Sequence, residues 1–415
     1  MRPEAGAGWQ PLRSPRRAGG LSAFTRLMRA HALSIMGDTL VTLALANSVF
    51  FDVSPEAARE KVLLYLVLTM APFALVSPLL GPWIDATRGG RRLMIILAAF
   101  GRSIVCLLLI DDLDGLLLYP EAFAALVLAK SHAVARSALV PTVVRSHDEL
   151  VEANSKLTVT SGVVGFAIGI PGIAILRLGG ATWILALAMV AFAAAAVAAL
   201  KIPKVVVAAK PTDELERAEL RGAGVLLAAS AMALMRGIVG FLTFFVAFFL
   251  RADGAPAWWF GVVIALSALG GMGGAALAAP LRRSLREERI LVGALLLVSV
   301  MGGLAAFNGG RLWVALLAAS VGVAAASGKT AFDAIVQRDA PDANQGRSFA
   351  RFETRFQMAW VIGAVPPVLI SLPARAGFVV VAGAATFAVL SYLVGGHDRL
   401  FAKVRRRPLP PSTAP

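Results

Sequence analysis

The segment Gly81-Pro-Trp-Ile-Asp85-Ala-Thr-Arg88-Gly-Gly-Arg91-Arg92-Leu93 is a glycine-rich, strongly basic turn between two long apolar runs. The turn itself is too polar to cross a membrane, whereas the runs on either side have the length and composition of membrane helices. We therefore predict that it is a short hairpin loop on the cytoplasmic side of a membrane.

The composition of the chain agrees with a membrane protein. Of 415 residues, 58% are hydrophobic and only 16% are charged, against about 25% charge in a soluble domain. The formal net charge is +15, but the basic residues stand in short clusters between apolar runs, which argues against a nucleic-acid partner. The single cysteine, Cys106, and four scattered histidines give no disulfide and no metal-ligand spacing, so we expect no metal and no cofactor.

Twelve apolar stretches are each about as long as the ~20 residues that a transmembrane helix needs. They lie near 30–51, 62–84, 93–110, 119–139, 153–176, 180–201, 223–250, 257–280, 289–307, 311–335, 350–373 and 376–395. The predicted fold class is an all-α membrane protein with twelve transmembrane helices.

The loops between these stretches alternate in charge. Basic residues gather at the ends of the second, fourth, sixth, eighth and tenth stretches, whereas the opposite loops hold Asp52, Glu56, Asp111, Asp112 and Asp253. By the positive-inside rule the basic loops and both termini face the cytoplasm. We therefore expect a multi-pass protein of the plasma membrane, whose basic first twenty residues are a cytoplasmic tail and not a cleaved signal peptide.

Several features recur at nearly one offset. Asp38 in the first stretch falls opposite Arg236 in the seventh (236 − 38 = 198), and Lys130 falls opposite Lys329 (329 − 130 = 199). The Gly-Pro of the opening turn recurs as Ala-Pro, again 198 residues later (279 − 81 = 198). These repeats predict two pseudo-symmetric six-helix bundles, with the substrate at their interface near mid-membrane.

The predicted domain organisation follows from the polar linker near the midpoint of the chain. It is an N-terminal cytoplasmic tail (1–26), a first six-helix bundle (27–201), a cytoplasmic linker (202–221), a second six-helix bundle (222–396) and a C-terminal cytoplasmic tail (397–415).

The opening turn resembles the signature turn of the major facilitator superfamily, roughly G-x-x-x-D-R-x-G-R-R/K. Gly81, Asp85, Gly90, Arg91 and Arg92 stand in the corresponding roles. Alanine follows the Asp where the family has Arg, two extra residues precede the Gly-Arg-Arg, and Arg88 supplies the displaced charge. The resemblance implies a latch that locks helices together at the cytoplasmic side, while the alternative is a plain basic loop.

Further segments resemble the branch of the superfamily that contains the enterobactin and macrolide exporters. They are Arg136-Ser-Ala-Leu-Val-Pro141 with Glu152-Ala-Asn-Ser155, and Gln337-Arg-Asp-Ala-Pro341 with Gly346-Arg347. In the fifth stretch, Gly165 and Gly169 match the exporters' glycine-proline motif, although Phe166 replaces its proline. This resemblance implies an efflux transporter of small molecules.

Ionisable residues within membrane stretches are costly and are therefore candidates for transport. Asp38 is a candidate for proton exchange or for a fixed ion pair, with Arg236 as the expected partner in a central cavity. Arg102 lies midway along the third stretch, and Lys130 resembles an Arg of related proteins that is proposed to transfer protons. His132 is either a titrating group or a histidine hydrogen-bonded in place.

Two more groups of residues are singled out. Lys329 and Asp333 are four apart on one helix face, which favours a structural intramembrane pair. Glycine and proline soften a helix for bending, so the predicted hinges are Gly165, Gly169, Pro171, Gly363 and Pro366.

These observations predict a secondary active transporter that works by alternating access and exports small amphipathic or lipophilic compounds in exchange for protons. No G-x-x-x-x-G-K-[ST] sequence occurs, so energy from an ion gradient is expected. The alternatives are a lipid or lysolipid flippase, an uptake symporter, a membrane enzyme and a sensor or scaffold. We expect no enzymatic activity, a monomer, and a small-molecule substrate, protons and the lipid bilayer as partners.

Overall fold

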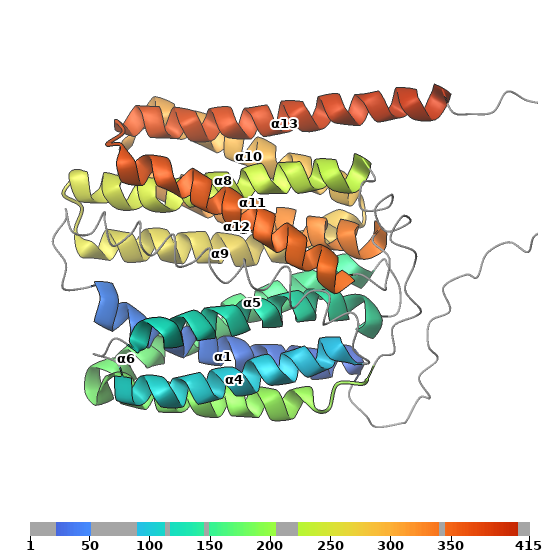
Figure 1. Ribbon diagram of the computed structural model, residues 1–415. Coiled ribbons are helices and arrows are strands. Elements are labelled where there is room, and N and C mark those ends of the chain that lie inside the picture. Colours follow the sequence, from blue (N-terminus) through green and yellow to red (C-terminus); the bar gives the residue numbers. More distant parts are fainter. Residues whose placement is uncertain are drawn as a thin grey trace, which may run out of the picture.

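The computed structural model describes residues 22–50, 89–112, 117–144, 149–204, 223–339 and 345–405, which are almost entirely helical (Figure 1). The helices are α1 (Ala23–Phe50), α4 (Gly90–Asp112), α5 (Leu118–Val143), α6 (Leu150–Ala199), α8 (Ala223–Ala252), α9 (Ala257–Arg282), α10 (Glu287–Asn308), α11 (Gly310–Asp339), α12 (Gln345–Leu369) and α13 (Ala374–Arg405). The predicted second helix, 62–84, lies outside the described residues.

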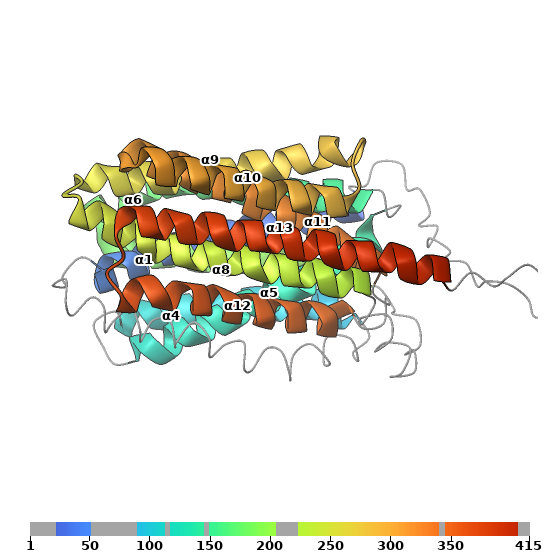
Figure 2. The ribbon, with the colours of Figure 1, turned by 90° about the horizontal axis from the view of Figure 1, so that it is seen from above.

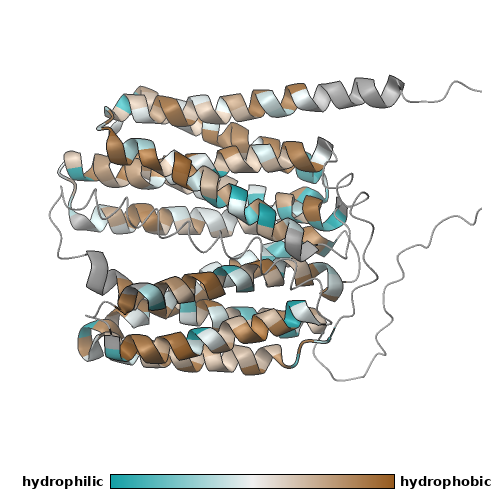
Figure 3. Cartoon of the chain, in the orientation of Figure 1, coloured by the Kyte–Doolittle hydropathy of each residue, from teal (hydrophilic) through white to brown (hydrophobic). Residues whose placement is uncertain are grey.

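The helices have the surface of a membrane protein. Within the described ranges, eight helices are long and apolar enough to cross a bilayer. Large apolar side chains such as Phe100, Ile264, Phe307 and Val394 are exposed on the outside of the structure, and apolar residues colour most of the helix surfaces in Figure 3. An apolar exterior of this extent is stable in lipid and not in water.

Helix α6 consists of two helices that meet at Gly180. A straight helix of its 50 residues would be about 75 Å long, far longer than the ~30 Å hydrocarbon core. Gly180 has φ +77°, which only glycine adopts readily, and the helix breaks there.

Contacts with α1 show that the chain reverses at this break. The Leu157 carbonyl lies 3.2 Å from His31 Nε2, and the Lys201 carbonyl accepts a hydrogen bond of 2.9 Å from Arg26 Nη1. Both ends of the segment therefore lie beside the first turns of α1. This agrees with the separate stretches predicted at 153–176 and 180–201.

The packing joins distant parts of the sequence. Helices α1 and α4 pack against α6, α8 packs against α12, α9 packs against α11, and α10 packs against both α11 and α13. Contacts of α6 with α9 and α11, and of α5 with α12, join the part of the chain before the linker to the part after it. Figures 1 and 2 show the long axes of most helices running in roughly the same direction.

Helices α9 and α11 are in close backbone contact. A Cβ atom added at Gly270 would lie 2.1 Å from the Ala319 carbonyl oxygen, and one at Gly274 would lie 2.1 Å from that of Val323. The two backbones therefore touch, as small-residue motifs allow between membrane helices.

Candidate functional site

Asp38 forms an ion pair within the first part of the chain. Its Oδ1 atom accepts a hydrogen bond of 2.6 Å from Arg102 Nη1. The Arg102 side chain is 2% exposed, whereas that of Asp38 is 37% exposed. Arg102 Nη2 also donates to Ser34 Oγ at 2.8 Å, and its guanidinium lies 4.4 Å from the centre of the Phe192 ring. The arginine is thus held in place, and the carboxylate is the accessible partner.

This geometry corrects the expected pairing of Asp38 with Arg236. Arg102 lies on α4, and both α4 and α1 pack against α6. Arg236 instead lies on α8, which packs chiefly against α12. Equivalent positions in a repeat are related by symmetry and need not touch. Arg102 is therefore the direct partner of Asp38.

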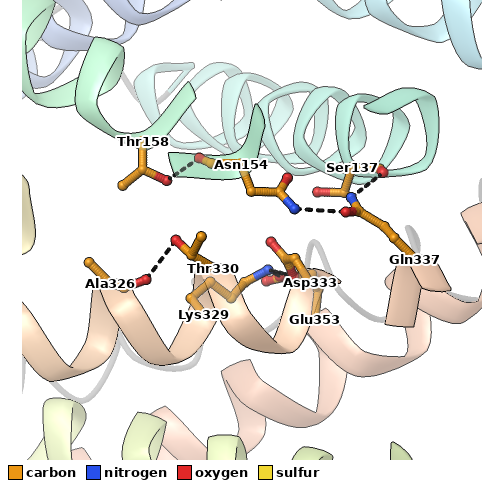
Figure 4. A network of polar contacts seen from close by, with 9 residues as sticks. All are labelled: Ser137, Asn154, Thr158, Ala326, Lys329, Thr330, Asp333, Gln337 and Glu353. Atoms are coloured by element: carbon orange, nitrogen blue, oxygen red, sulfur yellow. Dashed lines mark hydrogen bonds and ion pairs between the residues drawn. The ribbon is translucent and has the colours of Figure 1, made fainter. Parts of the chain in front are cut away.

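A second charged group joins α11 and α12. Lys329 Nζ lies 2.5 Å from Asp333 Oδ1 and 2.9 Å from Glu353 Oε1, so one ammonium bridges two carboxylates (Figure 4). The side chains of Lys329, Asp333 and Glu353 are 21%, 8% and 23% exposed. The predicted pair is therefore part of a three-membered cluster.

Glu353 was not a candidate from the sequence. It stands between Arg351 and Arg355 at the start of the predicted eleventh helix, where charge indicates a membrane boundary. The available signal was that it is the single acidic residue of the stretch 350–373.

Cations from two other helices surround this cluster. Lys130 of α5 and Arg236 of α8 both interact electrostatically with Glu353, and the buried Arg136 of α5 interacts with Asp333 and Glu353. The charged cluster is hereafter Lys130, Arg136, Arg236, Lys329, Asp333 and Glu353. Its members come from α5, α8, α11 and α12, on both sides of the linker in sequence.

His132 lies in a buried pair of histidines. Its ring stacks on that of His31 with centroids 6.3 Å apart, and neither of its ring nitrogens has a hydrogen-bond partner among the described residues. His31 is held by Ser161 Oγ at 2.8 Å from Nε2 and by Arg136 Nη1 at 3.1 Å from the same atom. The hydrogen-bonded histidine of this pair is therefore His31 and not His132.

Hydrogen bonds connect the part of the chain before the linker to the part after it, near the start of α6 and the end of α11. Asn154 Nδ2 donates to Gln337 Oε1 at 2.7 Å, and Gln337 Nε2 donates to the Ser137 carbonyl at 3.0 Å (Figure 4). Ser155 Oγ donates to the Ala275 carbonyl. All of these residues except Ala275 belong to the segments that resemble the exporter branch, so motifs that are about 200 residues apart in sequence meet in the structure.

Comparison with protein families identifies the superfamily of the chain. Residues 27–364 match the model of the Major Facilitator Superfamily. The chain belongs to this superfamily. The match confirms the predicted superfamily, while the exporter branch stays a prediction.

Two mycobacterial proteins resemble the chain in sequence. An uncharacterized protein of Mycobacterium leprae is 29% identical over 388 residues, which are 83% of this chain and 66% of the relative. An uncharacterized protein of Mycobacterium tuberculosis is 29% identical over 406 residues, or 87% of this chain and 71% of the relative. The chain thus spans only about two thirds of the length of these relatives.

Three solved transporters share the fold. A bacterial homologue of the iron transporter ferroportin in its outward-facing state has a TM-score of 0.72 at 19% identity, covering 91% of this chain and 100% of the homologue. The human organic anion transporter MFSD10 has a TM-score of 0.68 at 16% identity, covering 89% and 98%. The Escherichia coli fucose:proton symporter has a TM-score of 0.65 at 14% identity, covering 93% and 98%.

Part of the turn that was predicted to be the signature turn lies at the start of α4. Gly90 begins the helix, Arg91 Nη1 donates to the Ala138 carbonyl at 3.0 Å, and Arg92 Nη2 donates to the Leu200 carbonyl at 2.6 Å. These two arginines tie α4 to α5 and to the end of α6. Gly81, Asp85 and Arg88 lie outside the described residues.

The three predicted hinge glycines lie at helix contacts. Cβ atoms at Gly165 and Gly169 would lie 4.0 and 3.8 Å from Thr39 of α1, and one at Gly363 would lie 2.0 Å from the Gly237 carbonyl of α8. Pro171 and Pro366 lie within α6 and α12. Gly363 is therefore required for close packing, and its role in bending stays a prediction.

A cavity of about 580 Å³ lies between the end of α8 and the turn from α12 to α13. It is lined by Phe245, Phe248, Phe249, Pro367 and Leu372, with Arg251 and Asp253 among its polar lining. Its walls are mainly apolar and aromatic, which suits the apolar part of an organic compound.

Proposed function

We propose that the protein is a twelve-helix secondary active transporter of two six-helix bundles, residues 27–201 and 222–396. It works by alternating access and exports small amphipathic or lipophilic compounds across the plasma membrane in exchange for protons. The observation that carries this proposal is the charged cluster, whose residues come from both sides of the linker. Membership of the superfamily supports transport, because such halves move about a binding site between them.

Asp38 is the proposed proton carrier. Its carboxylate is accessible, and its partner Arg102 is fixed by further bonds to Ser34 and to the Ala98 carbonyl. Protonation of Asp38 removes the ion pair and leaves the arginine charge uncompensated within the membrane, which is costly. The two protonation states of Asp38 therefore favour different arrangements of α1 and α4, which is what coupling requires.

The bonds between Asn154, Gln337 and Ser137 are proposed to close the cytoplasmic side. They lie beside the predicted basic loops, which supports a cytoplasmic position for this end and for both termini. Opening toward the cytoplasm then requires that these bonds break.

Transport by purified protein in liposomes tests the proposal. With an imposed proton gradient and a panel of amphipathic compounds, we expect the internal pH to change as substrate is transported. Asp38→Asn should reduce proton-coupled transport by about 10-fold or more. Glu288→Gln is the matched control, because Glu288 is 35% exposed and forms an ion pair with Arg338 at 3.3 Å outside the proposed site. Proton movement that is unchanged in Asp38→Asn would contradict the proposal.

An uptake symporter is the second candidate. Protonation of the Asp38–Arg102 pair couples proton movement to substrate uptake as well as to substrate export, and the fucose:proton symporter shares the fold. The direction of proton flux relative to substrate flux in the same liposomes separates the two. A lipid flippase would instead move fluorescent lysolipids between the leaflets.

A further inference from the structure

Arg236 is a cation near the middle of a membrane helix, and no described residue is its direct partner. It lies 13 residues after the first residue of α8 (236 − 223 = 13), or about 20 Å along the axis. Its guanidinium makes no hydrogen bond or ion pair within the part of the chain that the structure describes, and its Nε atom is buried without a partner. Such an arrangement is rare, because a charge at this depth is normally paired.

The surroundings of Arg236 favour a negative charge. Lys130 and Lys329 repel it, and Glu353 is the carboxylate that it interacts with. Glu353, however, makes its direct ion pair with Lys329 at 2.9 Å. The region around Arg236 therefore has a positive potential and a guanidinium with unused donors.

We propose that Arg236 binds an anionic group of the transported compound, a carboxylate, sulfonate or phosphate. The proposal rests on the proposed transport function and narrows its substrate class to amphipathic anions. A guanidinium presents paired N–H donors that match two oxygens of such a group, and the low local dielectric strengthens this contact. The anion supplies the neutralising charge that the described residues do not, and the apolar body of the compound lies among the neighbouring helices.

The competing explanation is that Arg236 only compensates Glu353. In that case, if neutralising one of the two residues weakens binding of the anionic compound, neutralising both together would restore it. If Arg236 instead binds the substrate, neutralising Glu353 leaves the guanidinium available, and the double variant retains the defect of the Arg236 variant. The two explanations therefore differ in the double variant.

Binding to the full-length protein in nanodiscs of neutral lipid tests the inference without transport. The probes are three fluorescent compounds that share one aromatic body: dansyl-glycine, which is anionic, dansyl amide, which is neutral, and dansyl cadaverine, which is cationic. We expect wild-type protein to bind dansyl-glycine most tightly. Arg236→Gln should weaken that binding by about 10-fold, the worth of one charge-assisted contact, and leave dansyl amide binding unchanged.

Further variants control for folding and for general charge. Arg289→Gln removes an exposed arginine at the start of α10, away from the charged cluster and the cavity, and should leave all three affinities unchanged. Arg236→Lys should retain part of the preference for the anion, because it keeps the charge but not the planar donors. Thermal unfolding of each variant establishes that it is folded.

Three outcomes would overturn the inference: no binding of dansyl-glycine by wild-type protein, equal binding of the anionic and neutral probes, or restored binding in Arg236→Gln/Glu353→Gln. Proton-coupled transport of neutral or cationic compounds with no preference for anions would leave the proposed function standing and remove this inference. Binding that prefers the anion through Arg236 but is never followed by transport would remove the proposed function instead.

Discussion

Lys329 is the residue on which the stability of the charged cluster depends. Its ammonium is the direct partner of both Asp333 and Glu353, so Lys329→Met leaves two mostly buried carboxylates without the cation that contacts them directly among the described residues. Breaking a buried pair costs about 3–5 kcal/mol. We therefore expect Lys329→Met to lower the free energy of unfolding by about 3 kcal/mol, measured by thermal unfolding of the detergent-solubilised protein.

Lys156→Met is the matched control for Lys329→Met. Lys156 also pairs with a carboxylate four residues away, Glu152, at 2.6 Å, but both side chains are more than half exposed. An exposed pair of this kind contributes about 0.3–0.5 kcal/mol. A Lys329→Met variant no less stable than Lys156→Met would show that the buried cluster does not stabilise the fold.

Single residues also show the limit of prediction from the sequence. Charge within apolar stretches identified Asp38, Arg102, Lys329 and Asp333, because burial of charge is costly whatever the fold. The partner of Asp38 was predicted wrongly, since the ion pair joins residues 64 apart on α1 and α4 and depends on tertiary packing. Glu353 was missed for the same reason, since its neighbours in sequence are basic and its partner lies on α11.

At the scale of elements, the contact between α9 and α11 depends on the absence of side chains. A Cβ at Gly274 would lie 2.1 Å from the Val323 carbonyl, whereas one at the adjacent Gly273 would meet nothing within 4 Å. We expect Gly274→Ala to destabilise the protein by about 1–3 kcal/mol, because the helices must separate. Gly273→Ala should stabilise it by up to about 1 kcal/mol through helix propensity. Thermal unfolding of the two variants side by side measures the difference, and equal melting temperatures would contradict the close contact.

Element boundaries were predictable where hydrophobicity alone sets them. The stretch 223–250 corresponds to α8, and 257–280 corresponds to α9, because a membrane helix ends where polar residues begin. The break in α6 was also predictable from membrane thickness, although the residue that makes it, Gly180, was not singled out. Which helices pack together was not predictable, since most of the described helices have apolar residues on their exposed faces as well as on their buried faces.

At the scale of the whole molecule, segments that were matched as sequence motifs form one structural junction. Ser137, Asn154 and Gln337 come from three such segments and are joined by two hydrogen bonds. These motifs therefore have a physical explanation, because each segment supplies a polar group that forms a hydrogen bond with a group of another segment. The described helices on either side of the linker are held together here by few bonds, which suits a contact that must open.

Crosslinking this junction tests whether it opens during transport. Asn154→Cys and Gln337→Cys, introduced together after Cys106→Ser removes the single native thiol, place two thiols where the amide groups are 2.7 Å apart. We expect a short reducible thiol-to-thiol crosslinker to abolish transport by the double-cysteine protein in liposomes, and a reducing agent to restore it. Each single-cysteine variant, treated in the same way, should transport at its untreated rate, because it forms no bridge. Full transport by the crosslinked protein would mean that α6 and α11 stay together throughout the cycle, and that the two parts of the chain do not separate at this end.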